Sequence, residues 1–173
     1  GPATSAQISA SYLTVYGSAP ATISFIEDAG YVRQVSPAGV ISTIAGNGTA
    51  GFAGDGGPST GAVFNFGTST LLYGRPGIAA DGAGNLHVAD HGNFRVRRLS
   101  VAGTASTVAG NGLEGFGSSG FGGDGGPAQD AQLRLPVSTA ALPPSSAEPK
   151  AVVRTVATIF LSLVLTVSSA LPA

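Results

Sequence analysis

Two histidines and a few carboxylates are the side chains whose types could do chemistry in this sequence. His87 and His91 lie four positions apart, the spacing at which a helix presents two imidazoles to one metal ion. The segment Leu86 to Ala89, however, is typical of a strand, in which four residues span about 13 Å. We therefore expect no shared metal site at these histidines.

Asp55 and Asp124 each lie in a Gly-Asp-Gly-Gly loop. A carboxylate among loop carbonyls could meet Ca²⁺, which makes both residues weak metal candidates. Asp before Gly is also the ordinary chemistry of a tight turn, and this interpretation is favoured. Because the sequence has no Gly-x-Ser-x-Gly motif, no cysteine and no phosphate-binding loop with lysine, we predict no catalytic residue, no cofactor and no enzymatic activity.

The elements that carry these residues are predicted to be short strands. Leu86 to Ala89, Phe94 to Leu99 and Val40 to Ile44 are rich in β-branched and aromatic residues and are bounded by Gly, Asn and Asp. Dipeptides such as Asp81-Gly82 and Asn47-Gly48 supply the positive φ that tight hairpins need. No helical apolar stripe precedes Leu135, so the predicted fold class is all-β.

One phrase occurs three times: GPATSAQI at 1–8, GPSTGAVF at 57–64 and GPAQDAQL at 126–133. A second match, without gaps, relates GVISTIAGNG at 39–48 to GTASTVAGNG at 103–112. Repetition over several tens of residues indicates stacked supersecondary units. The first copy lacks the Gly-Asp-Gly that precedes the other two, from which we expect a fragment or shortened member of a longer protein.

Residues 74–112 resemble an NHL repeat, followed by the GDGGPA loop common in its extracellular and bacterial members. The resemblance covers roughly residues 1–136, although the first unit is degenerate and has Tyr31 where the second has Arg95. The third unit stops matching after Pro136. The residues that match the family's pattern are Pro76, Gly77, Ile78, Asp81, Gly84, Asn85, Leu86, Val88, Ala89, Asp90, Gly92, Asn93, Arg95 and Arg97.

The resemblance implies one four-stranded antiparallel blade of a β-propeller per repeat, and about two blades here. Because a ring needs at least about four blades, two cannot close, and unpaired strand edges are templates for another chain. Self-assembly is therefore the expected behaviour. The expected organisation is a degenerate repeat at 1–56, a repeat at 57–125, the start of a third at 126–136, a Pro/Ser/Ala linker at 137–150 and a hydrophobic segment at 151–173.

Residues 155–173 carry no charge, and three interpretations of them stay open. They could anchor the chain in a membrane, directly or as a signal for a glycolipid anchor. They could form a buried assembly strand, which their period-two alternation favours. They could also be a reading-frame artefact. The apolar face of the strand would comprise Ile159, Leu161, Leu163, Leu165 and Val167.

Charge is sparse: 8 basic residues stand against 9 acidic ones, and charged residues make up 10% of the chain. No long-range field would attract nucleic acid, so nucleic-acid binding is not expected. Arg95 and Arg97 are predicted to be structural residues of the turn and corner, on a solvated strand face. Asp81 and Asp90 are predicted turn and corner residues, and the Asp90 carboxylate is expected to accept backbone N–H bonds or to pair with Arg95.

We therefore expect a non-enzymatic structural or interaction protein, extracellular or at the cell surface, that docks or self-assembles through exposed β-edges. Its expected partners are further copies of itself or other proteins, with glycans at the Asn47-Gly48-Thr49 sequon. Two alternatives remain. One is a membrane- or glycolipid-anchored adhesion ectodomain, and the other is a piece of a larger ligand-binding or catalytic propeller.

Overall fold

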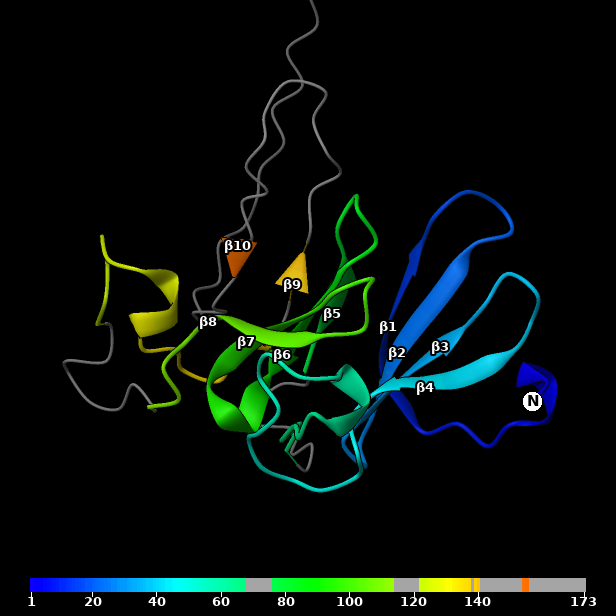
Figure 1. Ribbon diagram of the computed structural model, residues 1–173, viewed down its shortest axis with the longest axis horizontal. Coiled ribbons are helices and arrows are strands. Elements are labelled where there is room, and N and C mark those ends of the chain that lie inside the picture. The colour runs from blue at the N-terminus through cyan, green and yellow to red at the C-terminus, as the bar shows by residue number, and fades with distance from the viewer. Residues whose placement is uncertain (68–75, 114–121, 138, 141–153, 156–173) are drawn as a thin grey trace, which may run out of the picture.

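The computed structural model describes residues 1–67, 76–113, 122–137, 139–140 and 154–155. In these ranges the chain is all-β, with two four-stranded antiparallel sheets that share one core (Figure 1). Helical structure there is limited to 3-10 turns of three residues each. The predicted fold class is thus confirmed. The turns are η1 (Ala3–Ser5), η2 (Ser59–Gly61), η3 (His91–Asn93) and η4 (Ala128–Asp130).

The first sheet, blue to cyan in Figure 1, is a run of consecutive hairpins. β-Branched and aromatic residues give its strands extended backbone and two distinct faces. Glycine closes the tight turn between the second and third strands, where Gly30 adopts a φ of 84°. The strands are β1 (Ala10–Tyr16), β2 (Thr22–Glu27), β3 (Tyr31–Val35) and β4 (Ile41–Ala45).

The second sheet, green in Figure 1, has the same order of hairpins. Its first turn forms at the predicted Asp81-Gly82 dipeptide. The Asp81 carboxylate accepts the backbone N–H groups of Ala83 at 3.0 Å and Asn85 at 2.9 Å, which fixes the turn. The strands are β5 (Ile78–Ala80), β6 (Leu86–Asp90), β7 (Arg95–Leu99) and β8 (Ala105–Ala109).

The two sheets repeat each other in register. Arg33 of β3 pairs with Phe25 of β2, and Arg97 of β7 pairs with Val88 of β6. An irregularity interrupts the pairing of the third and fourth strands at the same place in both sheets. Arg33 and Arg97 therefore occupy equivalent positions, as do Phe25 and Val88.

The repeated Gly-Pro loops tie each sheet to the segment that follows it. The N–H of Gly46, after β4, donates to the carbonyl of Ser59 at 3.0 Å, and the N–H of Gly110, after β8, donates to that of Ala128 at 2.9 Å. Both glycines have positive φ, 89° and 91°. The Ala-Gly-Asn-Gly motif and the Gly-Pro phrase are thus two halves of one recurring contact.

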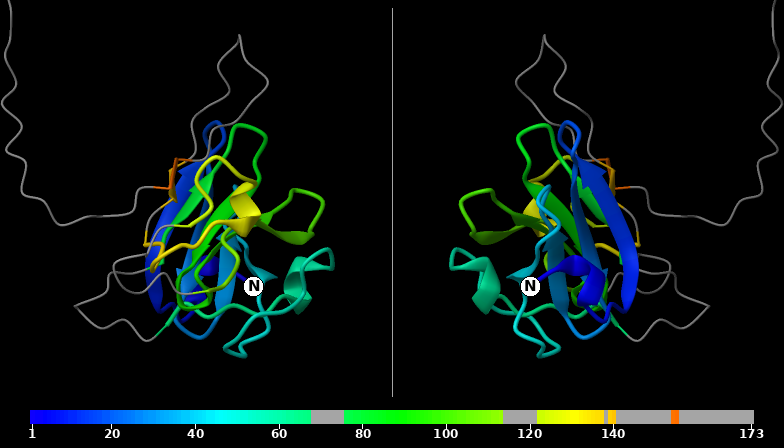
Figure 2. Two further views of the ribbon diagram at one scale, coloured as in Figure 1. Left: turned by 90° about the vertical axis from the view of Figure 1, so that its left-hand side faces the viewer. Right: turned by 90° about the vertical axis from the view of Figure 1, so that its right-hand side faces the viewer.

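The same loops also pair with the outer edge of a sheet. Ser59 donates its N–H to the carbonyl of Gly103 at 2.8 Å, which places η2 beside the hairpin of β7 and β8 (Figure 2). Likewise, Ala3 donates to the carbonyl of Gly39 at 2.8 Å, at the start of β4. The middle Gly-Pro loop therefore joins the two sheets.

The core lies between the sheets. One face of the first sheet and the loop that follows it pack against one face of the second sheet, so that neither face is left to water. We call this loop, described over residues 46–67, the connecting loop. The buried members of the core are Ile26, Val32, Ala45, Ala62, Phe64, Phe66, Ile78, Leu86, Val88, Leu99 and Ala105.

A short strand pair, β9 (Thr139–Ala140) with β10 (Arg154–Thr155), lies next to β5 and β6. β9 falls within the segment expected to be a linker. Among the described residues no helix is both long and apolar enough to cross a bilayer. The predicted assembly strand, with Ile159, Leu161, Leu163, Leu165 and Val167, lies outside the described residues.

Candidate functional site

Arg97 of β7 lies where the connecting loop packs on the second sheet. Its side chain is fully buried, and its guanidinium lies 2.8 Å from the Asp55 carboxylate and 3.3 Å from that of Asp90. It also donates to the carbonyls of Val63, at 3.3 Å, and Ala53, at 3.2 Å. A buried guanidinium needs such partners, which its two terminal nitrogens have, whereas its buried Nε has none among the described residues. Arg97 therefore fastens the connecting loop to the second sheet.

Aromatic rings of the connecting loop complete this surrounding. The Arg97 guanidinium lies 4.8 Å from the ring centre of Phe52 and 5.1 Å from that of Phe64, and the Arg95 guanidinium lies 3.8 Å from the ring centre of Phe52. Such contacts stabilise a cation by about 0.5–2 kcal/mol each. The loop thus presents both charge and ring faces to the two arginines.

Asp90 is a fully buried carboxylate at the end of β6. It accepts the backbone N–H of Asn65 at 2.8 Å and the Asn93 amide at 2.9 Å, besides its ion pair with Arg97. Burial raises the pKa of Asp90 to about 6, although the bonds from Asn93, Asn65 and Arg97 act in the opposite direction. Asp90 therefore links the end of β6 to Asn65, Asn93 and Arg97.

The burial of Arg97 and the partners of both arginines differ from what the sequence predicts. Arg97 is not on a solvated face but buried beneath the connecting loop, and it pairs with Asp90, for which Arg95 is the predicted partner. Arg95 donates instead to the carbonyls of Asn93, at 3.0 Å, and Asn111, at 2.8 Å. The prediction was wrong because strand alternation does not reveal whether a loop covers the face.

Asp81 and His87 form a second polar contact, at the turn of the second sheet. Their side chains lie 3.3 Å apart. Burial alone would raise the pKa of Asp81, but the hydrogen bonds from Asn85, His87 and Ala83 outweigh it and lower the pKa below its ordinary value. Asp81 therefore carries its charge while it holds the turn.

The two histidines have separate partners. Nδ1 of His91 lies 3.2 Å from the carbonyl oxygen of Pro136, and burial lowers the His91 pKa. His87 lies against Asp81 at the other end of β6. Across the described ranges no three His, Cys, Asp or Glu side chains gather in a way that could hold a metal ion.

The two weak metal candidates have different surroundings. Asp55 is engaged by Arg97 and by the Thr107 hydroxyl, at 2.6 Å. Asp124, at the equivalent place in the next Gly-Asp-Gly-Gly loop, is exposed, and no ion pair of it is found within the described part of the chain. Asp55 therefore acts as a fastener of the connecting loop.

The first sheet carries an apolar face that is exposed along β1 but buried at Phe25 and Ile41, and we call it the back face. Leu13 and Val15 on it are 60% and 56% exposed. By register, its residues are equivalent to those of the second sheet that are covered by the first, where Ile78 is only 6% exposed. The back face comprises Leu13, Val15, Ile23, Phe25, Arg33, Val35, Ile41 and Thr43, equivalent to Ile78, Ala80, Leu86, Val88, Arg97, Leu99, Ala105 and Thr107.

Arg33 is the charged residue of the back face. Its guanidinium lies 3.2 Å from the Glu27 carboxylate, which stands where Asp90 stands in the second sheet. The Arg33 side chain is 23% exposed, whereas that of Arg97 is fully buried. Within the described ranges Arg33 has no second carboxylate in the place that Asp55 takes beside Arg97.

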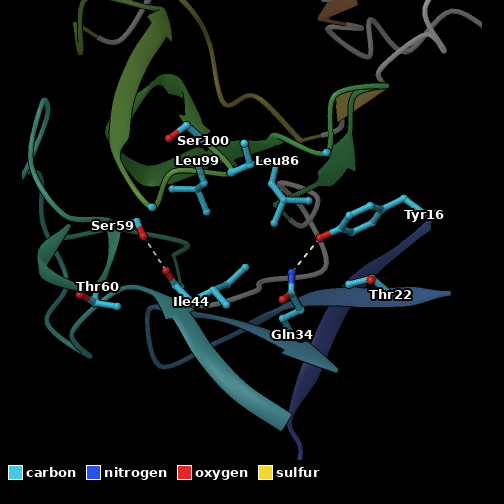
Figure 3. A pocket seen from close by; sticks show the side chains of 12 residues that line it. Tyr16, Thr22, Gln34, Ile44, Ser59, Thr60, Leu86, Leu99 and Ser100 are labelled. Carbon is cyan, nitrogen blue, oxygen red and sulfur yellow. Dashed lines mark hydrogen bonds between the residues drawn. The ribbon is translucent and has the colours of Figure 1, made fainter. Parts of the chain in front are cut away.

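A pocket of about 470 Å³ opens between the two sheets (Figure 3). Tyr16 and Gln34 of the first sheet face Leu86 and Leu99 of the second across it, and the Gln34 amide donates to the Tyr16 hydroxyl at 2.7 Å. Among the described residues that line it, none has a charged side chain. Its chemistry is that of hydroxyl, amide and apolar groups.

Asn47 is exposed in the loop after β4, with its Oδ1 accepting the N–H of Thr49 at 2.9 Å. This location agrees with the exposed loop that glycosylation needs. Attachment of a glycan remains a prediction.

Phe52 and Phe64 were missed as functional positions by sequence reasoning. A signal was present, since Gly-Phe-x-Gly-Asp-Gly-Gly occurs at both 51–57 and 120–126. Phe52 lies three residues before Asp55, as Phe121 does before Asp124, which indicates that the ring and the carboxylate contact the same side chain.

No protein-family model matches this chain, and no curated protein matches it. Among solved structures, it is similar to a structural-genomics protein of unknown function from Bacteroides thetaiotaomicron, with a TM-score of 0.52 and 21% identity over 69% of this chain and 27% of that chain. It also matches an auxiliary nutrient binding protein from the same organism, with a TM-score of 0.46 and 12% identity over 74% of this chain and 32% of that chain.

The chain thus spans less than a third of the first of these proteins, at 27% of its length. The likeness concerns the fold alone. Together with the two antiparallel sheets, it shows a β-rich fold compatible with a propeller-like repeat domain.

Proposed function

We propose that this chain is a non-enzymatic interaction module built from NHL-type propeller blades, which works outside the cell or at its surface by associating with further blades. The observation that supports it most is the back face. The equivalent face of the second sheet is buried, whereas the first sheet presents Leu13 and Val15 to solvent. Large exposed apolar groups on one face mark interaction sites.

The chemistry at the sheet junction supports a structural role. The carboxylates of Asp55 and Asp90 are both engaged by Arg97, and the Asp55 carboxylate also accepts from Thr107. Groups saturated in this way hold a loop in place and are poorly placed to transfer protons to a substrate. Association of blades uses this same pattern of loop, carboxylate and arginine.

The proposal is tested by light scattering over a range of protein concentrations. The unaltered chain is expected to gain mass as concentration rises, while the double variant Leu13→Glu, Val15→Glu stays at the mass of one chain. Val101→Glu is the matched control, because Val101 is 71% exposed but lies in the turn after β7. An unaltered chain that remains single at every concentration would contradict association.

The pocket supports a second candidate function, the binding of a small neutral ligand by a propeller. Its hydroxyl and amide groups together with Leu86 and Leu99 suit an uncharged polyhydroxylated molecule such as a sugar. Saturation-transfer NMR with a set of neutral mono- and disaccharides checks it. A signal that Gln34→Leu abolishes would support this function, and no signal from any sugar would exclude the class.

A further inference from the structure

We propose that the back face binds a second copy of this chain, whose Gly126–Ala128 replaces Gly1–Ala3 on β4 and whose Asp124 pairs with Arg33. This inference rests on the proposed association of blades and names its partner and its contact. It follows from a contact that the molecule already makes once, between its own connecting loop and its second sheet.

That contact provides the template. Gly57 accepts the N–H of Ala105 at 3.1 Å, so the Gly-Pro loop is held against the edge of β8. Two residues before Gly57, the Asp55 carboxylate receives the Arg97 guanidinium at 2.8 Å and the Thr107 hydroxyl at 2.6 Å. Main-chain pairing at the edge thus sets the position at which the carboxylate meets its arginine.

The first sheet carries the same donor side chains for a carboxylate. Arg33 and Thr43 pair with each other across β3 and β4, as Arg97 and Thr107 do across β7 and β8. Thr43 is exposed and Arg33 is partly exposed, so both are accessible to a carboxylate from outside the sheet. The β4 edge is also able to take a Gly-Pro loop, since Gly1 accepts the N–H of Ile41 at 3.1 Å.

The third Gly-Pro loop carries the matching acceptor, the Asp124 carboxylate. Asp124 lies two residues before Gly126, as Asp55 lies two residues before Gly57. The inner side of this loop is already held, because Gly110 donates its N–H to the carbonyl of Ala128 at 2.9 Å. The groups that meet a sheet edge in the template are the N–H of Ser59 and the Asp55 carboxylate. Their equivalents in the third loop are the N–H of Ala128 and the carboxylate of the exposed Asp124.

The exchange keeps the number of main-chain hydrogen bonds on β4. Gly1–Ala3 and Gly126–Ala128 have the same sequence, Gly-Pro-Ala, so β4 makes the same main-chain bonds with either. The incoming loop adds the ion pair of Asp124 with Arg33, and the second copy covers Leu13 and Val15. Opposite charges and an apolar face at one site favour a partner that brings both.

Charge reversal tests the contact by sedimentation equilibrium on the full chain. Arg33→Glu alone and Asp124→Arg alone are each expected to raise the dissociation constant at least about tenfold, and the two together in one chain restore it to within about threefold. Asp130→Arg is the matched control, because Asp130 is exposed in the same loop but stands where the middle loop has Gly61.

The Arg33→Glu substitution places a second carboxylate beside Glu27, so the fold of this variant is checked by circular dichroism. Thr43→Val is a further variant that changes no charge. It removes the hydroxyl equivalent to that of Thr107 and is expected to weaken association about threefold or more. If the unaltered chain associates but the reversals have no effect, or are not rescued in combination, the Asp124–Arg33 contact is wrong while association through the back face stands. If the unaltered chain does not associate, the proposed function itself fails.

Discussion

The guanidinium of Arg97 and the carboxylate of Asp55 lie 2.8 Å apart, although one belongs to β7 and the other to the loop that precedes the second sheet. This ion pair joins two repeats rather than two strands of one repeat. In the proposed association, a second copy would have to reproduce this contact, and the stability of the junction is expected to depend on it.

Replacing Arg97 by Met is expected to lower the free energy of unfolding by about 3–5 kcal/mol, because Asp90 would be left buried without its cation. Chemical denaturation measures the loss. The matched control is Arg33→Met, at the equivalent position of the first sheet, where the pair is partly exposed and the cost is expected to be about 1 kcal/mol. Equal losses in the two variants would show that the junction is not organised around Arg97.

Asp90 is expected to titrate near pH 6, and Asp81 below its ordinary value. Carbon-13 NMR of the two carboxyl groups measures both. Between the unfolded pKa of 3.8 and about 6, the folded state keeps a proton on Asp90 that the unfolded state has released, so this residue makes stability fall as pH rises through that window.

The Asp90→Asn variant isolates this slope. His91 acts in the opposite direction, since its lowered pKa makes stability rise with pH below the unfolded value of 6.5. Only the Asp90 contribution disappears in the variant, so the difference between variant and unaltered chain follows Asp90 alone. A difference that does not change between pH 4 and 6 would contradict the raised pKa.

Gly110→Ala is expected to cost about 3 kcal/mol or more, because the added Cβ would collide with the carbonyl oxygen of Phe94 at a φ of 91°. Gly103→Ala is the matched control. Its φ is also positive, 79°, but nothing lies near the added Cβ, so about 1 kcal/mol is expected. Thermal unfolding of the two variants gives the comparison, and similar losses would argue against the close approach at Gly110.

The C-terminal segment is predicted to act as a strand, with Leu163 on its apolar face and Ser162 on the other. Leu163→Asp should then reduce the mass of the assembly, and Ser162→Asp should not, because only the apolar face packs on a neighbour. Light scattering measures this effect. Partition of the unaltered chain into the detergent phase of a cloud-point separation would instead support the membrane anchor.

The strands and their turns could be predicted from the sequence because local signals determine them. A turn begins at Asp81, although its positive φ lies at Gly84 and not at the predicted Gly82, and β-branched and aromatic residues indicate the strands. The burial of Arg97 could not be predicted, because it depends on a loop distant in the chain. The Phe52 ring shows the same limit in part, since the repeated Gly-Phe-x-Gly-Asp-Gly-Gly motif indicates that a ring accompanies the loop aspartate but not which cation it covers.

Disulfide capture between two single-cysteine variants tests the central claim most directly, since the chain has no cysteine of its own. Thr43→Cys chains are mixed with Asp124→Cys chains under mild oxidation. The account predicts a covalent heterodimer that forms faster in the mixture than either homodimer, and faster than in the matched mixture of Val101→Cys with Asp124→Cys. A heterodimer that forms no faster than in the Val101→Cys mixture would contradict docking of the third Gly-Pro loop on the back face.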